Sequence, residues 1–133
     1  MKALQTIQLK AARSVTGHDR FASTREVLRQ CGWLSVRQLT AYHTLLLLRN
    51  VMKNKSPVAL YKMFDDEYCY NTRQAASGKL KCHRKPKLEL IKKSFGWRAV
   101  ELCNRLPEDI RSIESTEGFK KKAKEWIRNT ISI

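Results

Sequence analysis

The sequence is poor in the features that cross-link a small protein or place it in a membrane. Its four cysteines lie at 31, 69, 82 and 103 and form no CxxC pair, so we expect small buried thiols rather than zinc ligands. The longest apolar run is the LLLL at 45–48, which is much shorter than a membrane span. The N-terminus lacks the apolar core of a secretory signal. We therefore expect an intracellular protein without disulfides or membrane segments.

Acidic residues are also scarce. The 133 residues include 27 Lys and Arg but only 12 Asp and Glu, which gives a formal net charge of +15 and a pI near 10.1. Such an excess of positive charge attracts polyanions, and nucleic acid is the first candidate. Because 42% of the residues are hydrophobic, the chain should fold. We expect a single domain over 1–133, too small to hold the fingers, palm and thumb of a polymerase.

The stretch MFDDEY contains Asp65 and Asp66, the kind of carboxylate pair with which polymerases bind catalytic Mg²⁺. Nucleotidyl transfer needs such carboxylates fixed between strands, and a further acid from another segment. Neither is present, because the pair follows a predicted helix and the nearest upstream acid is Glu26. The three histidines are isolated, and adjacent Cys82 and His83 point in opposite directions on an extended chain. We expect a solvated turn at the acid pair, and no catalytic residue, metal or cofactor.

The spacing of apolar residues predicts a mainly α, multi-helix domain. Two capping boxes, STRE at 23–26 and SVRQ at 35–38, should begin helices by satisfying free backbone amides. Between the fourth and fifth helices, tyrosines, Thr72, Gly78 and Pro86 favour turns, so we expect a small β-hairpin insertion there. The expected parts are a helical part at 1–64, a basic hairpin or loop at 65–93 and C-terminal helices at 94–133. The expected helices cover 3–15, 23–31, 35–53, 57–64, 95–106 and a last one from residue 116.

The stretch RQAASGKLKCHRKPKLELIKK is the predicted nucleic-acid-binding segment. Phosphates can meet its cations, and unpaired bases can meet the nearby rings of Tyr68 and Tyr70. The alternative is a solvated loop, which a run of charge often is. The lysines at 120–124 are more simply explained as the wet face of the last helix. The predicted nucleic-acid-binding residues are Arg73, Lys79, Lys81, Arg84, Lys85, Lys87, Lys92 and Lys93.

Three stretches carry a further pattern, in order along residues 4–128. They are LQTIQLKAAR near the start, GWLSVRQLTAYHTLLLLRNVMKNKSPVAL in the middle, and SFGWRAVELCNRLPEDIRSIESTEGFKKKAKEWI near the end. Together they resemble the C-terminal region of reverse transcriptases from animal non-LTR retrotransposons of the jockey and chicken-repeat type. Ser35 stands where that family usually has proline, and Cys103 where it usually has tryptophan. The matching positions of the first stretch are Leu4, Ile7, Gln8, Ala11 and Arg13.

The resemblance implies a non-catalytic module that grips template RNA or target DNA beside a polymerase core, in the nucleus. The catalytic palm of that family would lie upstream of Met1, so the chain is expected to be a fragment of an RNA-directed DNA polymerase. Its expected partners are RNA or DNA and the upstream polymerase core. Neither a membrane nor a small-molecule substrate is expected as a partner. The alternative is a structural, protein-docking module. In that case the apolar positions of the first helix, at 4, 7, 11, 12 and 15, would pack on the polymerase core.

Overall fold

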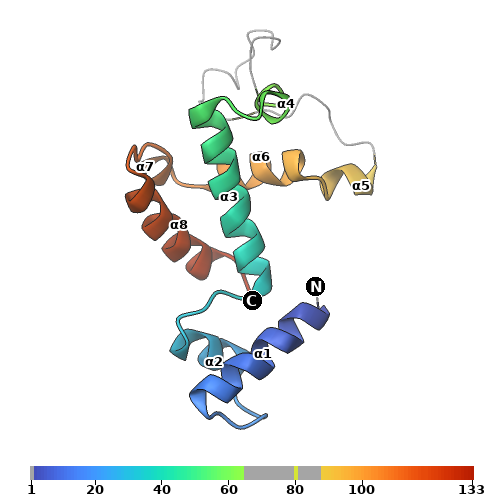
Figure 1. Cartoon of the computed structure of the whole chain (residues 1–133), viewed down its shortest axis with the longest axis vertical. Helices are drawn as coiled ribbons and strands as arrows, with labels where there is room; N and C mark the ends of the chain where they lie inside the picture. Colours follow the sequence, from blue (N-terminus) through green and yellow to red (C-terminus); the bar gives the residue numbers. More distant parts are fainter. Residues whose placement is uncertain (1, 65–79, 81–87) are drawn as a thin grey trace. The chain divides into compact units, whose positions relative to one another are not determined.

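The computed structural model describes residues 2–64, 80 and 88–133, and this part of the chain is mainly helical (Figure 1). No strand occurs among these residues. The prediction of a mainly α fold is therefore confirmed. The helices are α1 (Lys2–Thr16), α2 (Thr24–Gln30), α3 (Val36–Asn54), α4 (Val58–Tyr61), α5 (Glu89–Lys92), α6 (Phe95–Arg105), α7 (Glu108–Arg111) and α8 (Thr116–Thr130).

The β-hairpin expected over 65–93 falls almost entirely outside the described residues. Its last part is described, and there the prediction is wrong, because Glu89–Lys92 forms the short helix α5. The local sequence LELIKK has no Gly or Pro and is rich in Leu, Glu and Lys, which are good helix formers. Lys92 Nζ donates to Glu89 Oε1 at 2.5 Å, one turn away on the same helix face.

The chain forms two compact units. Unit 1 consists of residues 1–42 and 123–133, and unit 2 of residues 43–122. Each unit contains part of α3 and part of α8, and each has a buried cluster of its own.

In unit 1, α1 and α2 lie side by side (Figure 1). Ala12 of α1 and Val27 of α2 are fully buried, and Leu28 is nearly so. Ala12 has a small side chain, so the two helices can approach closely at this point. Leu9, Ala22 and Cys31 pack around this cluster and complete the core between the two helices.

Of the apolar positions of α1, at 4, 7, 11, 12 and 15, only one is buried by this chain. Ala12 is buried, but Leu4, Ile7 and Val15 have exposed fractions of 60%, 64% and 72%. Two glutamine side chains of α1 bind the backbone around the start of α3. Gln5 Oε1 accepts from the backbone N–H of Val36 at 2.9 Å, and Gln8 Nε2 donates to the carbonyl of Leu34 at 2.7 Å. Because these bonds satisfy backbone groups around the start of α3, they fix which face of α1 turns inward.

The predicted capping box at the start of α3 is confirmed. The backbone N–H of Ser35 donates to Gln38 Oε1 at 3.0 Å, and the N–H of Gln38 donates to Ser35 Oγ at 3.2 Å. Both residues are buried, so an unpaired amide here would be costly. The other predicted box is only half right: Ser23 occupies the N-cap of α2 but makes no side-chain cap bond, and Glu26 pairs with Arg29 instead.

The helix α2 ends in a Schellman motif at Gly32. The N–H of Gly32 donates to the carbonyl of Arg29 at 3.0 Å, and the N–H of Trp33 donates to the carbonyl of Leu28 at 2.9 Å. Gly32 has φ +67°, in the left-handed region that disfavours any residue with a Cβ. The sequence prediction that Gly32 ends this helix is confirmed, and the motif fixes the backbone of Trp33.

We expect Gly32→Ala to lower the free energy of unfolding by about 1–2 kcal/mol. No heavy atom lies within 4 Å of the position that the new Cβ would take, so the cost comes from backbone strain alone. Urea unfolding followed by circular dichroism measures the change. Gln30→Ala, at an exposed helical position nearby, is the control and should stay within about 0.5 kcal/mol of the parent. Equal stability of the two variants would contradict the motif.

The core of unit 2 forms between α3, the segment after α4, and α6. Leu48, Val51, Phe64, Ala99 and Val100 are its buried residues. Phe64 is 1% exposed, and its ring meets the ring of Phe95 edge to face, with centroids 6.2 Å apart. Of the four leucines at 45–48, Leu47 alone is exposed.

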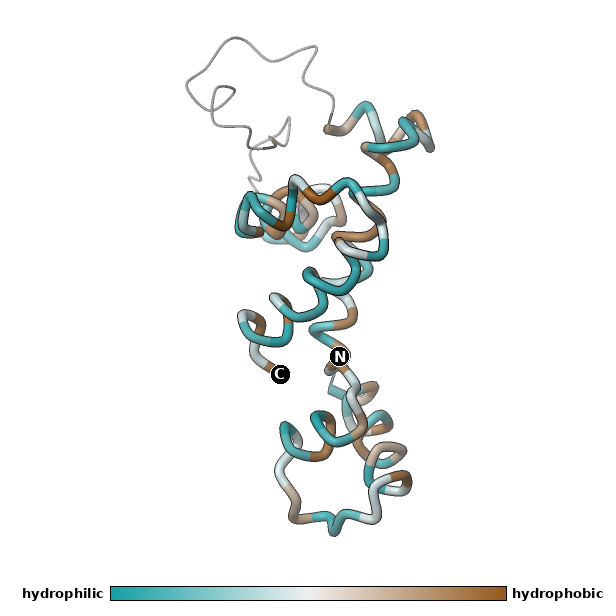
Figure 2. Tube along the Cα trace, turned by 90° about the vertical axis from the view of Figure 1, so that its left-hand side faces the viewer, coloured by the Kyte–Doolittle hydropathy of each residue, from teal (hydrophilic) through white to brown (hydrophobic). Residues whose placement is uncertain are grey.

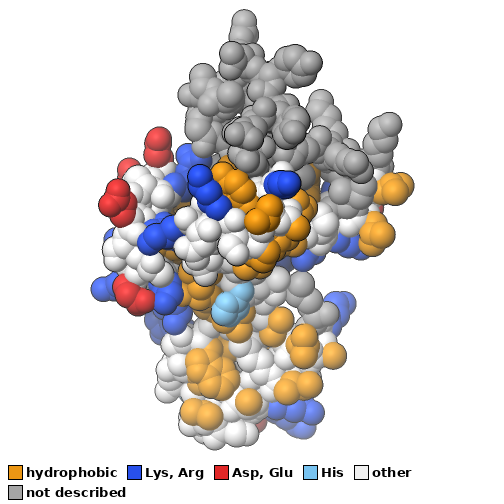
Figure 3. Space-filling view, turned by 45° about the horizontal axis from the view of Figure 1, so that its top comes forward, with side chains coloured by type: hydrophobic (Ala, Val, Ile, Leu, Met, Phe, Trp, Pro, Cys, Tyr) orange, Lys and Arg blue, Asp and Glu red, His pale blue; other side chains and the backbone are white. Residues whose placement is uncertain are grey.

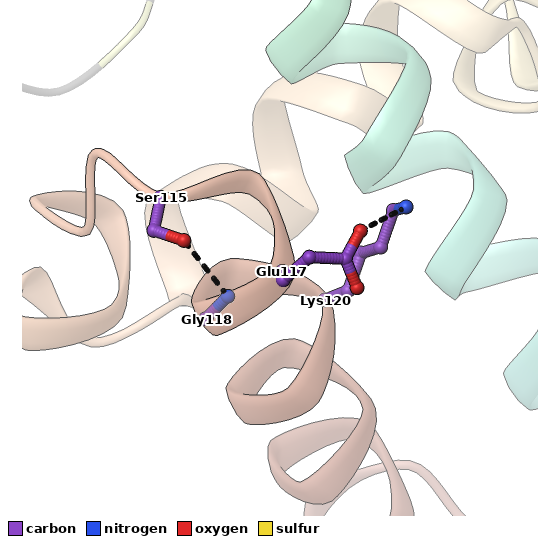
Figure 4. A network of polar contacts seen from close by, with 4 residues as sticks. All are labelled: Ser115, Glu117, Gly118 and Lys120. Carbon is purple, nitrogen blue, oxygen red and sulfur yellow. Dashed lines mark hydrogen bonds and ion pairs between the residues drawn. The ribbon is translucent and has the colours of Figure 1, made fainter.

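The capping residue of α8 lies one position earlier than predicted. Ser115, rather than Thr116, caps it, because Ser115 Oγ accepts from the N–H of Gly118 at 3.4 Å (Figure 4). Lys120 Nζ donates to Glu117 Oε1 at 2.8 Å in the same turn. The predicted inward face is confirmed, since Phe119 is buried in unit 2, and Ala123 and Ile127 are buried in unit 1. Most other positions of α8 are hydrophilic (Figure 2).

Two short elements differ from expectation. Pro57 occupies the N-cap of α4 rather than its first helical position, and the helix ends at Tyr61 before a turn to Phe64. The stretch LPEDI, expected as a turn, contains the one-turn helix α7. Pro107 precedes it, and Glu108 and Asp109 stand in its first turn, where acidic side chains are favourable.

Candidate nucleic-acid interface

The nucleic-acid-binding residues predicted from the sequence lie mostly outside the described part of the chain. Arg73, Lys79, Lys81, Arg84, Lys85 and Lys87 are not described, and neither are the acid pair at 65–66, the tyrosines at 68 and 70, nor Cys69, Cys82 and His83. Lys92 and Lys93 are described, and both are exposed. Lys92 pairs with Glu89, so part of its charge is compensated within α5. The prediction for this segment stays a prediction.

One residue of that segment is fixed in unit 2. Leu80 donates its backbone N–H to Asn104 Oδ1 at 3.0 Å and accepts from Asn104 Nδ2 at 2.9 Å. The side-chain amide of Asn104, on α6, thus satisfies both the backbone N–H and the carbonyl of Leu80. Leu80 packs against the core of unit 2.

A second group of cations, not singled out from the sequence, lines a groove of unit 1. We call this groove the unit 1 groove, and its volume is about 480 Å³. Among the residues described as lining it there is no Asp or Glu. Its cations are Arg25 and Arg29 from α2 and Arg128 from α8, and an indole ring, that of Trp33, lies at the same groove. The remaining lining comes from Leu28, Gln38 and residues 129–133.

The local structure explains why these cations share a surface. Arg25 and Arg29 are four residues apart on α2, so they lie on one helix face. That face is exposed, because Val27 and Leu28 bury the other side against α1. Arg128 comes from the last turns of α8 and donates from Nη2 to the carbonyl of Gly32 at 3.1 Å. The guanidinium of Arg128 is thereby held beside the backbone of Trp33.

Two effects reduce the positive potential of the unit 1 groove. Glu26 contacts Arg29 at 3.0 Å, and this hydrogen bond and ion pair raise the pKa of Arg29. The C-terminal end of α8 carries a partial charge of about −0.5. Arg25 and Arg128 together contribute two full positive charges, which outweigh that partial charge. Residues 1–42 and 123–133 contain nine Lys and Arg against three Asp and Glu, so the field of the whole unit is positive.

Trp33 also borders a second groove of unit 1, of about 280 Å³. Trp33 as a residue is 40% exposed. This smaller groove contains one cation, Lys124, and a second aromatic residue, Tyr42; its other lining residues are Gln8, Gly32, Leu34 and Leu39. An indole between two grooves that both contain cations is an arrangement suited to phosphates and a flat base together.

Unit 2 has a groove of a different kind, about 580 Å³ in volume and mostly apolar. Figure 3 shows hydrophobic side chains gathered on this unit with Lys and Arg beside them. Arg49 lines the groove, but its Nη2 donates to the carbonyls of Ile113 and Glu114, and its guanidinium lies 4.3 Å from the centroid of Phe119. Arg49 is therefore bound to its own chain and is a weaker candidate for phosphate contact than the arginines of unit 1.

The described cysteines give no sign of covalent chemistry. Cys31 and Cys103 are free thiols, both partly buried. Burial raises the pKa of Cys103, and the nearby charge of Arg111 only partly opposes this. Its thiol therefore stays protonated at neutral pH and is a poor nucleophile. Over 2–64, 80 and 88–133, no group of His, Cys, Asp and Glu side chains could hold a metal ion.

No helix among the described residues is long and apolar enough to cross a membrane. Comparison of the chain with family models, with curated proteins and with solved structures gave no match. The function is therefore argued from the residues of this chain and the sequence resemblance.

Sequence reasoning missed the unit 1 groove because it followed charge density along the chain. Arg25 and Arg128 are just over a hundred residues apart in the sequence, and only folding brings them, with Arg29, to one groove. One local signal was present: two arginines at i and i+4 followed by Gly-Trp, in REVLRQCGW. That pattern indicates a basic helix face next to an aromatic residue beyond the helix end.

Proposed function

We propose that the chain is a non-catalytic nucleic-acid-binding module that holds RNA or DNA through its phosphates. The observation that carries the proposal is the unit 1 groove. Arg25, Arg29 and Arg128 line it together with Trp33, and its described lining residues include no acidic side chain. The sequence resemblance adds a setting, the C-terminal region of a non-LTR retrotransposon reverse transcriptase. In that setting the module grips template RNA or target DNA next to the polymerase core.

Several properties of the chain support a grip on the backbone rather than base-specific recognition. Guanidinium groups bind phosphate oxygens with two parallel hydrogen bonds, and a phosphate backbone offers such oxygens in every sequence. The net charge of +15 gives a long-range attraction for any polyanion. The predicted basic segment at 73–93 would add phosphate contacts of its own, and Lys92 and Lys93 are its described end.

The affinity for nucleic acid should fall steeply with salt. Each phosphate contact releases condensed counterions. With contacts from the three arginines alone, the affinity should therefore fall about 20-fold to 40-fold between roughly 50 and 200 mM salt. If the basic segment brings the total to about 6 to 10 phosphates, the loss rises to about 10³ to 10⁵. Titration of a labelled RNA hairpin at the two salts, followed by fluorescence anisotropy, measures it. Flat affinity, or no binding at the lower salt, would refute the proposal.

A second candidate function is docking to a protein, and the exposed apolar stripe of α1 favours it. Leu4, Ile7 and Val15 lie on one face of α1 and are more than half exposed (hydrophobic side chains at the surface of unit 1 are visible in the lower part of Figure 3). Apolar side chains in a row at helical spacing are typical of a surface that packs on a partner. In this alternative the partner is the polymerase core, and the positive charge serves solubility.

The two functions can be separated by one variant. Leu4→Ser/Ile7→Ser/Val15→Ser should leave nucleic-acid affinity within about twofold if phosphate contact is the function, because it changes no charge. A polymerase core of the resembled family, added in trans, tests docking. A complex that survives about 1 M salt and is lost in this triple variant would favour docking, since apolar contacts are not screened by salt.

A further inference from the structure

We propose that the unit 1 groove selects single-stranded nucleic acid, with one unpaired base stacked on Trp33 while Arg25 and Arg128 bind the adjoining phosphates. This inference rests on the proposed function and specifies its ligand. It assigns to Trp33 a role that neither its position in the chain nor the charge of the protein requires.

The backbone of Trp33 is fixed before any ligand arrives. The N–H of Trp33 donates to the carbonyl of Leu28, and Gly32 before it is in the left-handed conformation of the Schellman motif. The carbonyl of Gly32 accepts from Arg128. Leu34, directly after Trp33, is 2% exposed and anchors the chain on the other side. A ring on such a backbone loses little further freedom when a base stacks on it.

Trp33 remains 40% exposed and borders two grooves, whereas Trp97 and Trp126 are more buried. A large apolar ring left accessible next to cations can be covered by the face of a base. Stacking of a base on an aromatic side chain strengthens binding by about 5-fold to 150-fold per base, and it tolerates any sequence because every base has a flat face.

The cations sit where the phosphates of such a strand would run. Arg25 and Arg128 line the same groove as Trp33 but come from different helices, α2 and α8. Lys124 lines the smaller groove on which Trp33 also borders. A strand whose base covers Trp33 can therefore place phosphates toward a cation in either groove.

A duplex cannot use Trp33 in this way. Its bases already stack on one another, and opening a step to admit a side chain costs a few kcal/mol. A duplex would therefore gain the phosphate contacts of the arginines alone. The proposal predicts a preference for single strands that depends on the aromatic ring at position 33.

The test compares a 12-nucleotide single-stranded RNA with the same sequence annealed to its complement, at about 100 mM salt. Trp33→Leu keeps an apolar side chain but removes the ring, and should weaken single-strand binding about 5-fold to 150-fold while changing duplex binding less than about twofold. Trp33→Phe keeps a ring and should recover most of the affinity. Phe21→Leu, at an exposed aromatic residue that lines neither groove, is the matched control and should bind both RNAs like the parent.

The outcomes separate this inference from the proposed function. Equal affinity of the parent for both RNAs, with Trp33→Leu unchanged on both, would overturn the stacking role and leave phosphate binding in place. Equal weakening on both RNAs by Trp33→Leu would also overturn it, because it points to a structural role for the ring. Failure of the parent to bind either RNA would refute the proposed function itself. Thermal melting of each variant shows whether it is folded.

Discussion

Replacing Arg25, Arg29 and Arg128 together with Gln is expected to weaken nucleic-acid binding about 10³-fold at roughly 50 mM salt. The slope of log affinity against log salt should become shallower by about 2 to 3, because each lost phosphate contact removes its share of counterion release. The three side chains line one groove, and all three are exposed, so the fold should tolerate the change. Fluorescence anisotropy over a salt series gives both quantities.

The matched control for that variant is Lys10→Gln/Lys62→Gln/Arg105→Gln. It removes the same charge from exposed positions that do not line the unit 1 groove. Long-range attraction should fall modestly, and the salt slope should change by less than about 1. If both triple variants lose the same affinity, binding depends on total charge and the groove has no special role.

Replacing Phe64 with Ala is expected to lower the free energy of unfolding by about 3–5 kcal/mol. Phe64 is 1% exposed, and it joins residues from α3 and α6 in the core of unit 2. Its loss leaves a cavity and removes the edge-to-face contact with Phe95. A small protein is stable by only about 5–15 kcal/mol, so the variant should lose a large part of that margin. Urea unfolding followed by circular dichroism measures the change.

Phe21→Ala serves as the control, because it deletes the same side chain at a position that is 79% exposed. Its free energy of unfolding should stay within about 0.5 kcal/mol of the parent. The guanidinium of Arg20 lies 4.9 Å from the ring centroid of Phe21, an exposed contact that adds little. Similar losses for the two variants would contradict the assignment of Phe64 to the core.

The boundaries of α2 and α3 could be predicted from the sequence to within one residue, because local signals determine them. Gly32 ends α2, and the exchange of amides between Ser35 and Gln38 begins α3. Both effects act within a few residues. The bond predicted for Ser23 was not formed, because Glu26 has an alternative partner in Arg29 one turn later. A capping box in the sequence therefore shows where a helix begins more securely than it shows which bonds form.

The inward face of α1 could not be predicted, because it depends on residues far along the chain. Hydrophobic periodicity identifies the stripe with Leu4, Ile7 and Val15, and this stripe is exposed in the structure. Gln5 and Gln8 are bound instead to the chain around the start of α3. The two bonds join residues that are 26 and 31 positions apart in the sequence. A periodic stripe shows that a face is apolar, but not that this chain covers it.

The candidate site was only partly accessible from the sequence. The net charge indicated a polyanion as the partner, and that expectation does not depend on the fold. The position of the groove depends on the packing of the end of α8 in the same unit as α2, which brings Arg128 to Arg25 and Arg29. No pattern within one segment contains that information.

The most direct test of the central claim is a site-resolved one. The backbone amide resonances of uniformly labelled protein can be followed by nuclear magnetic resonance while single-stranded RNA is added. We expect the largest shifts within 25–33 and 124–132, the segments that contain the lining residues Arg25, Arg29, Trp33, Lys124 and Arg128 of the two grooves. If RNA binds but these resonances stay in place while those of other segments move, the unit 1 groove is not where nucleic acid is held.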